Sequence, residues 1–154
     1  MSIIDCIKDN YCDAAVSHCA EKECKLRLTG LDNYVILKGE KICKDRKICD
    51  HIIFVGNDLI LIIVVEFKSR NARPREIEEK LVNCSRAAVD ILEKRVGVDS
   101  PPKFEFYHLV VVRNWRPHEY RRIVNTKLTI RGKRYDIIPK ARDVSLFDLL
   151  SNYR

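Results

Sequence analysis

Two acidic residues and a lysine interrupt the most apolar part of the sequence. Glu66 and Lys68 follow residues 59–65, which are all apolar, and Asp50 lies within the preceding apolar stretch. A run of this kind indicates a central strand that is covered on both faces. Residues two apart on a strand point to the same side, so we expect Glu66 and Lys68 to leave the sheet together and Phe67 to face the opposite way.

These residue types predict a cation site. Two desolvated carboxylates repel each other and need compensation, which a hard ion such as Mg²⁺ or Mn²⁺ would give. Such ions bind a few carboxylate oxygens and keep several waters, so the expected ligands are Asp50, Glu66 and the main-chain carbonyl of Phe67. Lys68 would lie beside a metal-bound water. Taken alone, Glu66 and Lys68 also fit an ordinary exposed ion pair at a strand end.

The proximity of Asp50 to Glu66 depends on a hairpin. A Gly-Asn-Asp turn at residues 56–58 separates the strands expected at residues 48–55 and 59–67. In an antiparallel pair, the residue numbers of directly opposed residues always add up to the same value. The value for Asp50 and Glu66 differs by one from the value that a tight turn there would give, so the two residues should be nearly opposite each other. The pattern leaves open whether a three-residue loop or a bulge places both side chains on one face.

The other elements follow from hydrophobic period and turn residues. The chain length fits a single domain, 1–154, with an α/β core at about residues 3–112 and a basic C-terminal addition at 113–154. The expected order is αβββαβ, a central mixed sheet flanked by helices. The elements are a helix from Ile3 to about Lys25 capped by Ser2, a strand at 34–37, a helix from Pro74 to near Gly97 with Ile77, Leu81, Cys84, Ala88 and Leu92 on its apolar face, a strand at 104–112, a basic loop at 114–122, a hairpin at 127–138 turning at Gly132, and a short helix at 145–150.

This arrangement resembles the PD-(D/E)XK nuclease superfamily, whose fold is called restriction-endonuclease-like. The resemblance covers about residues 3–112 and rests on Asp50, fifteen residues, and then Glu66-Phe67-Lys68 on the expected strands. It implies that Asp50 and Glu66 bind the metal and that Lys68 orients or activates the attacking water. The implied activity is Mg²⁺- or Mn²⁺-dependent hydrolysis of DNA phosphodiester bonds, with an endonuclease favoured over an exonuclease.

The sequence departs from the family pattern at Cys49, which stands where the name-giving proline would be. Many members also carry an acid on the first helix. Glu23 is the preferred candidate here and Glu21 the other, and either is equally compatible with a solvated surface charge. Small size and architecture are similar to archaeal Holliday-junction resolvases, but their Ser-x-Gly approach to the aspartate is missing, so a branched substrate is one possibility among several.

Positive charge is concentrated in one region. Residues 113–142 contain ten basic and two acidic side chains, whereas the rest of the chain is nearly neutral. Such a patch favours a polyanionic partner, here DNA, read through its backbone or shape. Trp115 would either stack on a base or anchor the core. The expected nucleic-acid contacts are Arg70, Arg73, Arg75, Arg131, Lys133 and Arg134.

Seven cysteines without a CxxC motif indicate buried free thiols more than a zinc or iron–sulfur site. The absence of glutamine, a single methionine and many charged residues are typical of thermophiles, in which intracellular disulfides occur, and Cys43 with Cys49 is one possible pair. The longest apolar run is far shorter than a membrane span, so we expect a cytoplasmic protein.

A homodimer is compatible with this reading of the chain. Two alternative interpretations fit the same residues: a catalytically inactive nucleic-acid-binding domain of the same fold, and an interaction subunit of a repair or defence complex.

Overall fold

A computed structural model describes residues 2–69, 71–95 and 102–153 of the chain. Its helices are α1 (Ile3–Asn10), α2 (Gly39–Ile42), α3 (Pro74–Arg95), α4 (Pro117–Asn125) and α5 (Leu146–Tyr153). Its strands are β1 (Ala15–Val16), β2 (Cys19–Glu21), β3 (Cys24–Arg27), β4 (Tyr34–Lys38), β5 (His51–Gly56), β6 (Leu59–Lys68), β7 (Lys103–Val112), β8 (Lys127–Ile130), β9 (Lys133–Ala141) and β10 (Asp143–Ser145).

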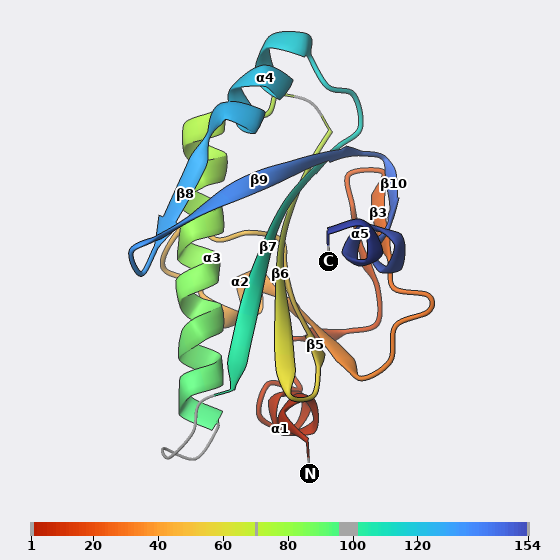
Figure 1. Ribbon diagram of the computed structural model, residues 1–154, viewed down its shortest axis with the longest axis vertical. Helices are drawn as coiled ribbons and strands as arrows, with labels where there is room; N and C mark the ends of the chain where they lie inside the picture. Colours follow the sequence, from red (N-terminus) through yellow and green to blue (C-terminus); the bar gives the residue numbers. More distant parts are fainter. Residues whose placement is uncertain (1, 70, 96–101, 154) are drawn as a thin grey trace.

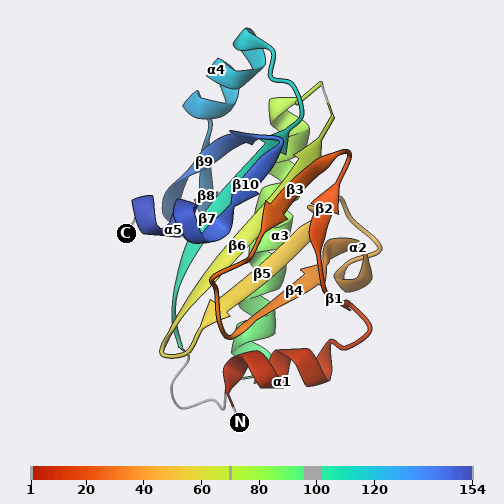
Figure 2. The same ribbon diagram turned by 90° about the vertical axis from the view of Figure 1, so that its right-hand side faces the viewer.

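A mixed sheet of seven strands, in the order β1-β4-β5-β6-β7-β9-β8, forms the middle layer. Strands β4, β5 and β6 are antiparallel neighbours, β6, β7 and β9 run parallel, and β8 returns antiparallel to β9. Helix α3 lies along one face of this sheet (Figure 1). The other face is covered by α5 and by a small sheet in the order β10-β3-β2 (Figure 2). The protein is therefore a three-layered α/β structure.

Strand β6 lies at the centre, and its side chains alternate between two cores. Ile62 and Val64 pack on the side of α3, whereas Ile63 and Val65 pack on the side of the small sheet. Burial on both faces explains why the strand is apolar from Leu59 to Val65, as the sequence indicated. Any polar residue on this strand is consequently held in fixed surroundings.

The first helix is much shorter than expected. Ser2 caps it through a reciprocal hydrogen-bond pair with Asp5, but the helix ends at Asn10, so the expectation of a helix to Lys25 was wrong. Residues 24–28 alternate between buried and exposed, which is the period of a strand and not of a helix. The strands β1, β2 and β3 thus stand between α1 and β4 in the expected αβββαβ order.

The C-terminal region also differs from the expectation. The basic segment at 114–122 is not a loop throughout, because Pro117 opens helix α4, whose residue Ile123 is buried in the core. The expected hairpin is present as β8 and β9, with a turn at Gly132, whose φ is positive. Because β9 pairs with β7, the C-terminal region extends the central sheet, and it also supplies β10 and α5 to the layer over the far face.

Helix α3 carries the apolar face that the sequence predicted. The five residues expected on that face are all buried: Ile77, Leu81, Cys84, Ala88 and Leu92. One of them, Cys84, forms a disulfide with Cys49 at the entrance to β5, with the two Cα atoms 5.8 Å apart. The pairing of Cys43 with Cys49 was therefore wrong, and Cys43 is a free thiol. Cys19 and Cys24 are buried free thiols, as expected.

Within the described part of the chain, no helix combines the length and apolarity needed to cross a bilayer.

Candidate active site

The β5–β6 hairpin brings Asp50 to Glu66. The ladder ends with the pair His51 and Val65, and one further residue on each strand leads to Asp50 and Glu66. At the other end Gly56 pairs with Ile60, so three residues connect the strands. This is the three-residue connection that the sequence left open.

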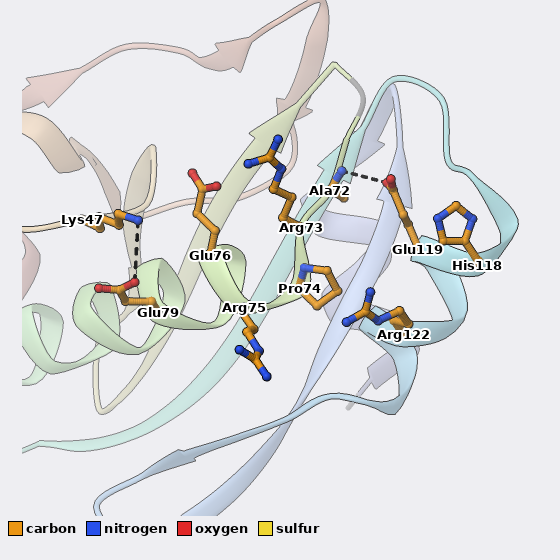
Figure 3. A pocket seen from close by; sticks show the side chains of 10 residues that line it. All are labelled: Lys47, Ala72, Arg73, Pro74, Arg75, Glu76, Glu79, His118, Glu119 and Arg122. Atoms are coloured by element: carbon orange, nitrogen blue, oxygen red, sulfur yellow. Dashed lines mark hydrogen bonds and ion pairs between the residues drawn. The ribbon is translucent and has the colours of Figure 1, made fainter.

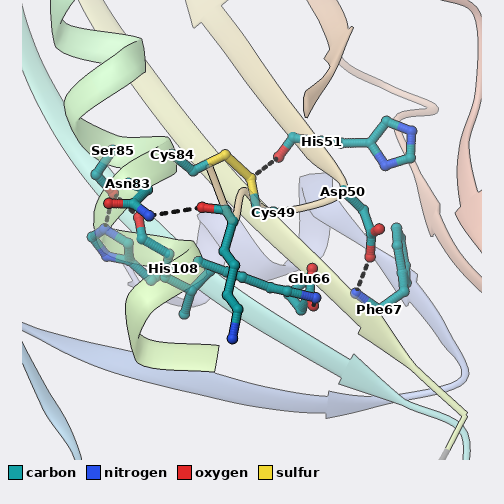
Figure 4. The surroundings of a disulfide bond; sticks show 12 residues. Cys49, Asp50, His51, Glu66, Phe67, Asn83, Cys84, Ser85 and His108 are labelled. Carbon is teal, nitrogen blue, oxygen red and sulfur yellow. Dashed lines mark hydrogen bonds and ion pairs between the residues drawn. A yellow bond between two sulfur atoms is a disulfide. The ribbon is translucent and has the colours of Figure 1, made fainter. Parts of the chain in front are cut away.

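Asp50 is held at the strand end by backbone hydrogen bonds. Its N–H donates to the Val65 carbonyl at 3.1 Å, and its Oδ2 accepts from the N–H of Phe67 at 2.7 Å (Figure 4). The N–H and C=O of one strand residue point to the same edge, so the Phe67 carbonyl also points toward β5. The carbonyl expected as a metal ligand thus lies on the same side of β6 as Asp50.

A close backbone contact fixes the segment before Asp50. The Gly39 N–H donates to the Asp50 carbonyl at 2.8 Å, and a Cβ at Gly39 would lie 1.9 Å from the Cys49 carbonyl oxygen. Only glycine permits this approach. Cys49 is bonded on its other side to Cys84 of α3, so this strand end is anchored to both α2 and α3.

Glu66 is a buried carboxylate with one oxygen paired and one oxygen free. Its side chain is 1% exposed, and its Oε2 accepts from the Lys80 ammonium at 2.9 Å. Its Oε1 has no hydrogen-bond partner among the described residues. A buried unpartnered carboxylate oxygen is costly, so this atom is a candidate position for a further ligand.

Glu66 is surrounded by charges that act on it in opposite directions. Burial, followed by the nearby negative charge of Asp50, raises the pKa of Glu66 to about 7, although Lys80 and Lys68 oppose the shift. The Lys68 ammonium lies 3.7 Å from Glu66 Oε2 and 3.7 Å from Glu76 Oε1. Glu76 also pairs with Lys80 at 3.4 Å. As predicted, Lys68 lies beside Glu66, while Phe67 packs in the opposite core.

Lys80 is the lysine that contacts Glu66 most closely. Burial works against its charge, but the ion pairs with Glu66 and Glu76 outweigh burial and raise the pKa of Lys80. Lys80 and Glu76 were not predicted from the sequence. Their signal was an i, i+4 acid–base pair in the first turns of a helix expected to begin just after the central strand.

A third acid approaches from the small sheet. Glu21, at the end of β2, shares a hydrogen bond with Asp50, and burial together with that interaction raises the pKa of Glu21. Lys22, the next residue, places its ammonium 3.4 Å from the Phe67 carbonyl oxygen. Glu23, the candidate preferred from the sequence, lies instead in the turn after β2 and pairs with Arg113. The expectation of an acid on the first helix was wrong because that helix ends before either glutamate.

The donor set fits a hard divalent cation. Asp50, Glu66 Oε1 and the Phe67 carbonyl are all oxygen donors, and one of them is buried without a partner. Among the described residues no group of three or more His, Cys, Asp or Glu side chains is spaced to hold a metal by itself. A coordination shell made of two carboxylates, one main-chain carbonyl and waters is nevertheless ordinary for Mg²⁺, which keeps several waters.

We expect cation affinity to rise with pH up to about 7 and then level off. Below the pKa of Glu66 the carboxyl group is protonated in the metal-free protein, so cation binding must displace that proton, and the Mn²⁺ association constant should rise about tenfold per pH unit. Titration calorimetry between pH 5.5 and 8.5 measures this dependence. Glu66→Gln, which does not titrate there, should bind weakly with a flatter profile; a flat wild-type profile would argue against the assignment.

The structure describes Arg73 and Arg75 but not Arg70, which lies outside the described residues. Both described arginines are exposed and flank Pro74 at the start of α3. Arg75 lies in the first turn of α3 and Arg73 just before it, close in sequence to Glu76, which pairs with Lys68 of the acidic site.

The hairpin tip between β8 and β9 lies elsewhere. Arg131 pairs with Glu93 near the far end of α3, while Lys133 and Arg134 are exposed. Glu93 follows Lys80 by thirteen residues, which is about 20 Å along a helix. The basic residues of the hairpin tip therefore lie away from Asp50 and Glu66.

Of the two roles expected for Trp115, stacking on a base or anchoring the core, the structure shows a contact with the core. Its Nε1 donates to the Lys140 carbonyl at 2.8 Å, and its half-buried ring packs against the core on the α3 side. The ring also meets Tyr120 edge-on. Its indole thus connects the start of α4 to β9.

No protein-family model, curated protein or solved structure matches this chain. The function must therefore be inferred from the site itself.

Proposed function

We propose that the protein is a divalent-cation-dependent nuclease of the PD-(D/E)XK type that hydrolyses phosphodiester bonds in DNA. The observation that carries the proposal is the free, buried Oε1 of Glu66, located beside Asp50 and flanked by the ammonium groups of Lys68 and Lys80. A surface ion pair at a strand end would leave no carboxylate oxygen buried without a partner.

Each residue has a separate role in this proposal. Asp50 and Glu66 would hold the cation together with the Phe67 carbonyl, and a bound Mg²⁺ or Mn²⁺ would supply positive charge at the scissile phosphate. Lys68, next to Glu66, orients the attacking water. The water oxygen bonds to phosphorus as the phosphorus–oxygen bond to the leaving strand breaks, which gives one phosphate monoester and one hydroxyl end.

The neighbouring basic groups favour substrate binding by the backbone. Arg73 and Arg75 are exposed at the start of α3 beside the site, and contacts from such residues carry affinity without reading sequence. We therefore propose selection by shape or strand structure in preference to a defined base sequence. The exposed arginines of α4 extend the basic surface.

A second candidate is a nucleic-acid-binding domain of the same fold that does not cleave. The observation that favours it is the 2.9 Å contact between Lys80 and Glu66 Oε2, with Lys22 on the Phe67 carbonyl, because these internal cations already compensate part of the acidic charge. The two candidates differ in whether cleavage occurs at all.

A cleavage assay separates these candidates. Supercoiled, linear, single-stranded and four-way-junction DNA are incubated with the protein in Mg²⁺, Mn²⁺ or EDTA. We expect metal-dependent cleavage of at least one substrate and its loss in both Asp50→Ala and Lys68→Ala, since these changes remove a ligand and the water-orienting group. Cleavage that survives both substitutions would contradict the proposed site, and binding without cleavage would favour the second candidate.

A further inference from the structure

A cavity of about 470 Å³ lies between the start of α3 and helix α4. Arg75 and Arg122 both line the cavity, and Figure 3 shows Arg122 extending from α4 toward Pro74, with Arg75 extending from α3 on the other side of Pro74. Ala72 contributes a small apolar surface to the wall, and His118 contributes an imidazole ring. Binding sites for small ligands span roughly 300–1,000 Å³, so the cavity has room for one nucleotide unit.

The acids of this cavity are engaged by neighbouring groups, whereas no described residue forms an ion pair with its arginines. Glu79 pairs with Lys47, Glu76 pairs with Lys68 and Lys80, and Glu119 accepts the Ala72 N–H at 2.8 Å. Among the described residues, no ion pair involves the guanidinium groups of the cavity, which belong to Arg73, Arg75 and Arg122. These guanidinium groups therefore remain available to an anion.

The cavity adjoins the candidate active site through Glu76. This residue lines the cavity and at the same time pairs with the two lysines that contact Glu66. The first turn of α3 thus lies between the candidate active site, with Asp50 and Glu66, and the cavity with its arginines. A strand whose scissile phosphate is at Asp50 and Glu66 would have an adjacent nucleotide within reach of the cavity.

We infer that the cavity binds one unpaired nucleotide next to the scissile phosphate, so that the preferred substrate carries a strand that has left the duplex stack. The inference rests on the proposed function. Arg75 and Arg122 hold the nucleotide phosphate as charge-assisted donors, and the His118 ring and Pro74 offer faces against which a base can lie. A base stacked in an intact duplex cannot enter a pocket between two helices, because it must first be turned out of the stack.

The ratio of two affinities tests this inference without cleavage. Fluorescence anisotropy in EDTA measures binding of a labelled duplex with one unpaired nucleotide and of a fully paired duplex of the same sequence. We expect wild-type protein to bind the first at least tenfold more tightly. Arg122→Ala should bring the ratio close to one, because a charge-assisted contact is worth about tenfold in affinity.

Arg121→Ala is the matched control. Arg121 is exposed on the same helix, one residue away, and does not line the cavity, so its replacement removes the same charge and should weaken both complexes equally. A wild-type ratio near one, or equal ratios in the two variants, overturns the inference. Pocket-dependent binding without any Mn²⁺-dependent cleavage overturns the proposed function alone, whereas cleavage with a ratio near one overturns the pocket assignment alone.

Discussion

Replacement of Glu66 by glutamine is expected to reduce DNA cleavage by about 10³-fold or more in a protein that still folds. The substitution keeps the shape of a buried side chain but removes the negative charge that would hold the cation. Loss of a metal that stabilises the transition state by several kcal/mol corresponds to a factor of this size. Single-turnover cleavage at saturating Mn²⁺, together with a thermal melt, measures both parts of the prediction.

Glu105→Gln provides the matched control for Glu66→Gln. Glu105 lies on the adjacent strand β7 but is exposed, so the same chemical change there should leave cleavage unchanged. If Glu66→Gln cleaves at a rate within tenfold of wild type, Glu66 is not a metal ligand and the proposed mechanism fails. A variant that loses its melting transition would leave the rate uninterpretable, and Asp50→Asn, at a half-buried position, then provides the same test.

Reduction of the Cys49–Cys84 disulfide is expected to lower the free energy of unfolding by about 2–4 kcal/mol. The bond closes a loop with a sequence separation of 35 residues, and opening such a loop returns conformational freedom to the unfolded chain. For a chain of this size the melting temperature should fall by roughly 10 °C. Calorimetry with and without a thiol reductant measures the change.

Two variants control for other effects of the reductant. Cys43→Ser, at a free thiol, should melt as the wild type does and keep the response to reductant. The double variant Cys49→Ala and Cys84→Ala should already melt at the lower temperature and no longer respond. Equal melting temperatures of oxidised and reduced wild-type protein would contradict the stabilising role of this bond.

The disulfide also connects two parts of the candidate site. Cys49 precedes Asp50, and Cys84 follows Lys80 by one helical turn on α3. The bond thus restrains the strand end that bears one acid relative to the helix that bears the closest lysine. Loss of the bond is expected to loosen the site as well as the fold.

The central strand and its polar residues could be predicted because their signals are local. An apolar run, a turn and a period of two are enough to place Glu66 and Lys68 on one face and Asp50 nearby. The same reasoning located the buried face of α3, since its residues recur with helical spacing. In each case the determining residues are close together in the sequence.

The contacts that the sequence did not reveal are non-local. Glu21 reaches Asp50 only because β2 folds over the sheet, and Cys84 reaches Cys49 only because α3 packs beside β5. The first helix was overextended because Ala15 and His18 match a helical period by chance, whereas His18 is exposed. Periodicity alone cannot distinguish a chance match from a true helical face, because it does not show which other part of the chain would cover that face.

Anomalous diffraction from crystals soaked in Mn²⁺ near pH 8 tests the cation site most directly. We predict one strong peak within coordination distance, about 2.0–2.6 Å, of an Asp50 oxygen, Glu66 Oε1 and the Phe67 carbonyl. The Lys22 ammonium should then have moved away from that carbonyl. A peak elsewhere, or no peak at this strand end in millimolar Mn²⁺, would contradict the assignment of Asp50 and Glu66 as metal ligands.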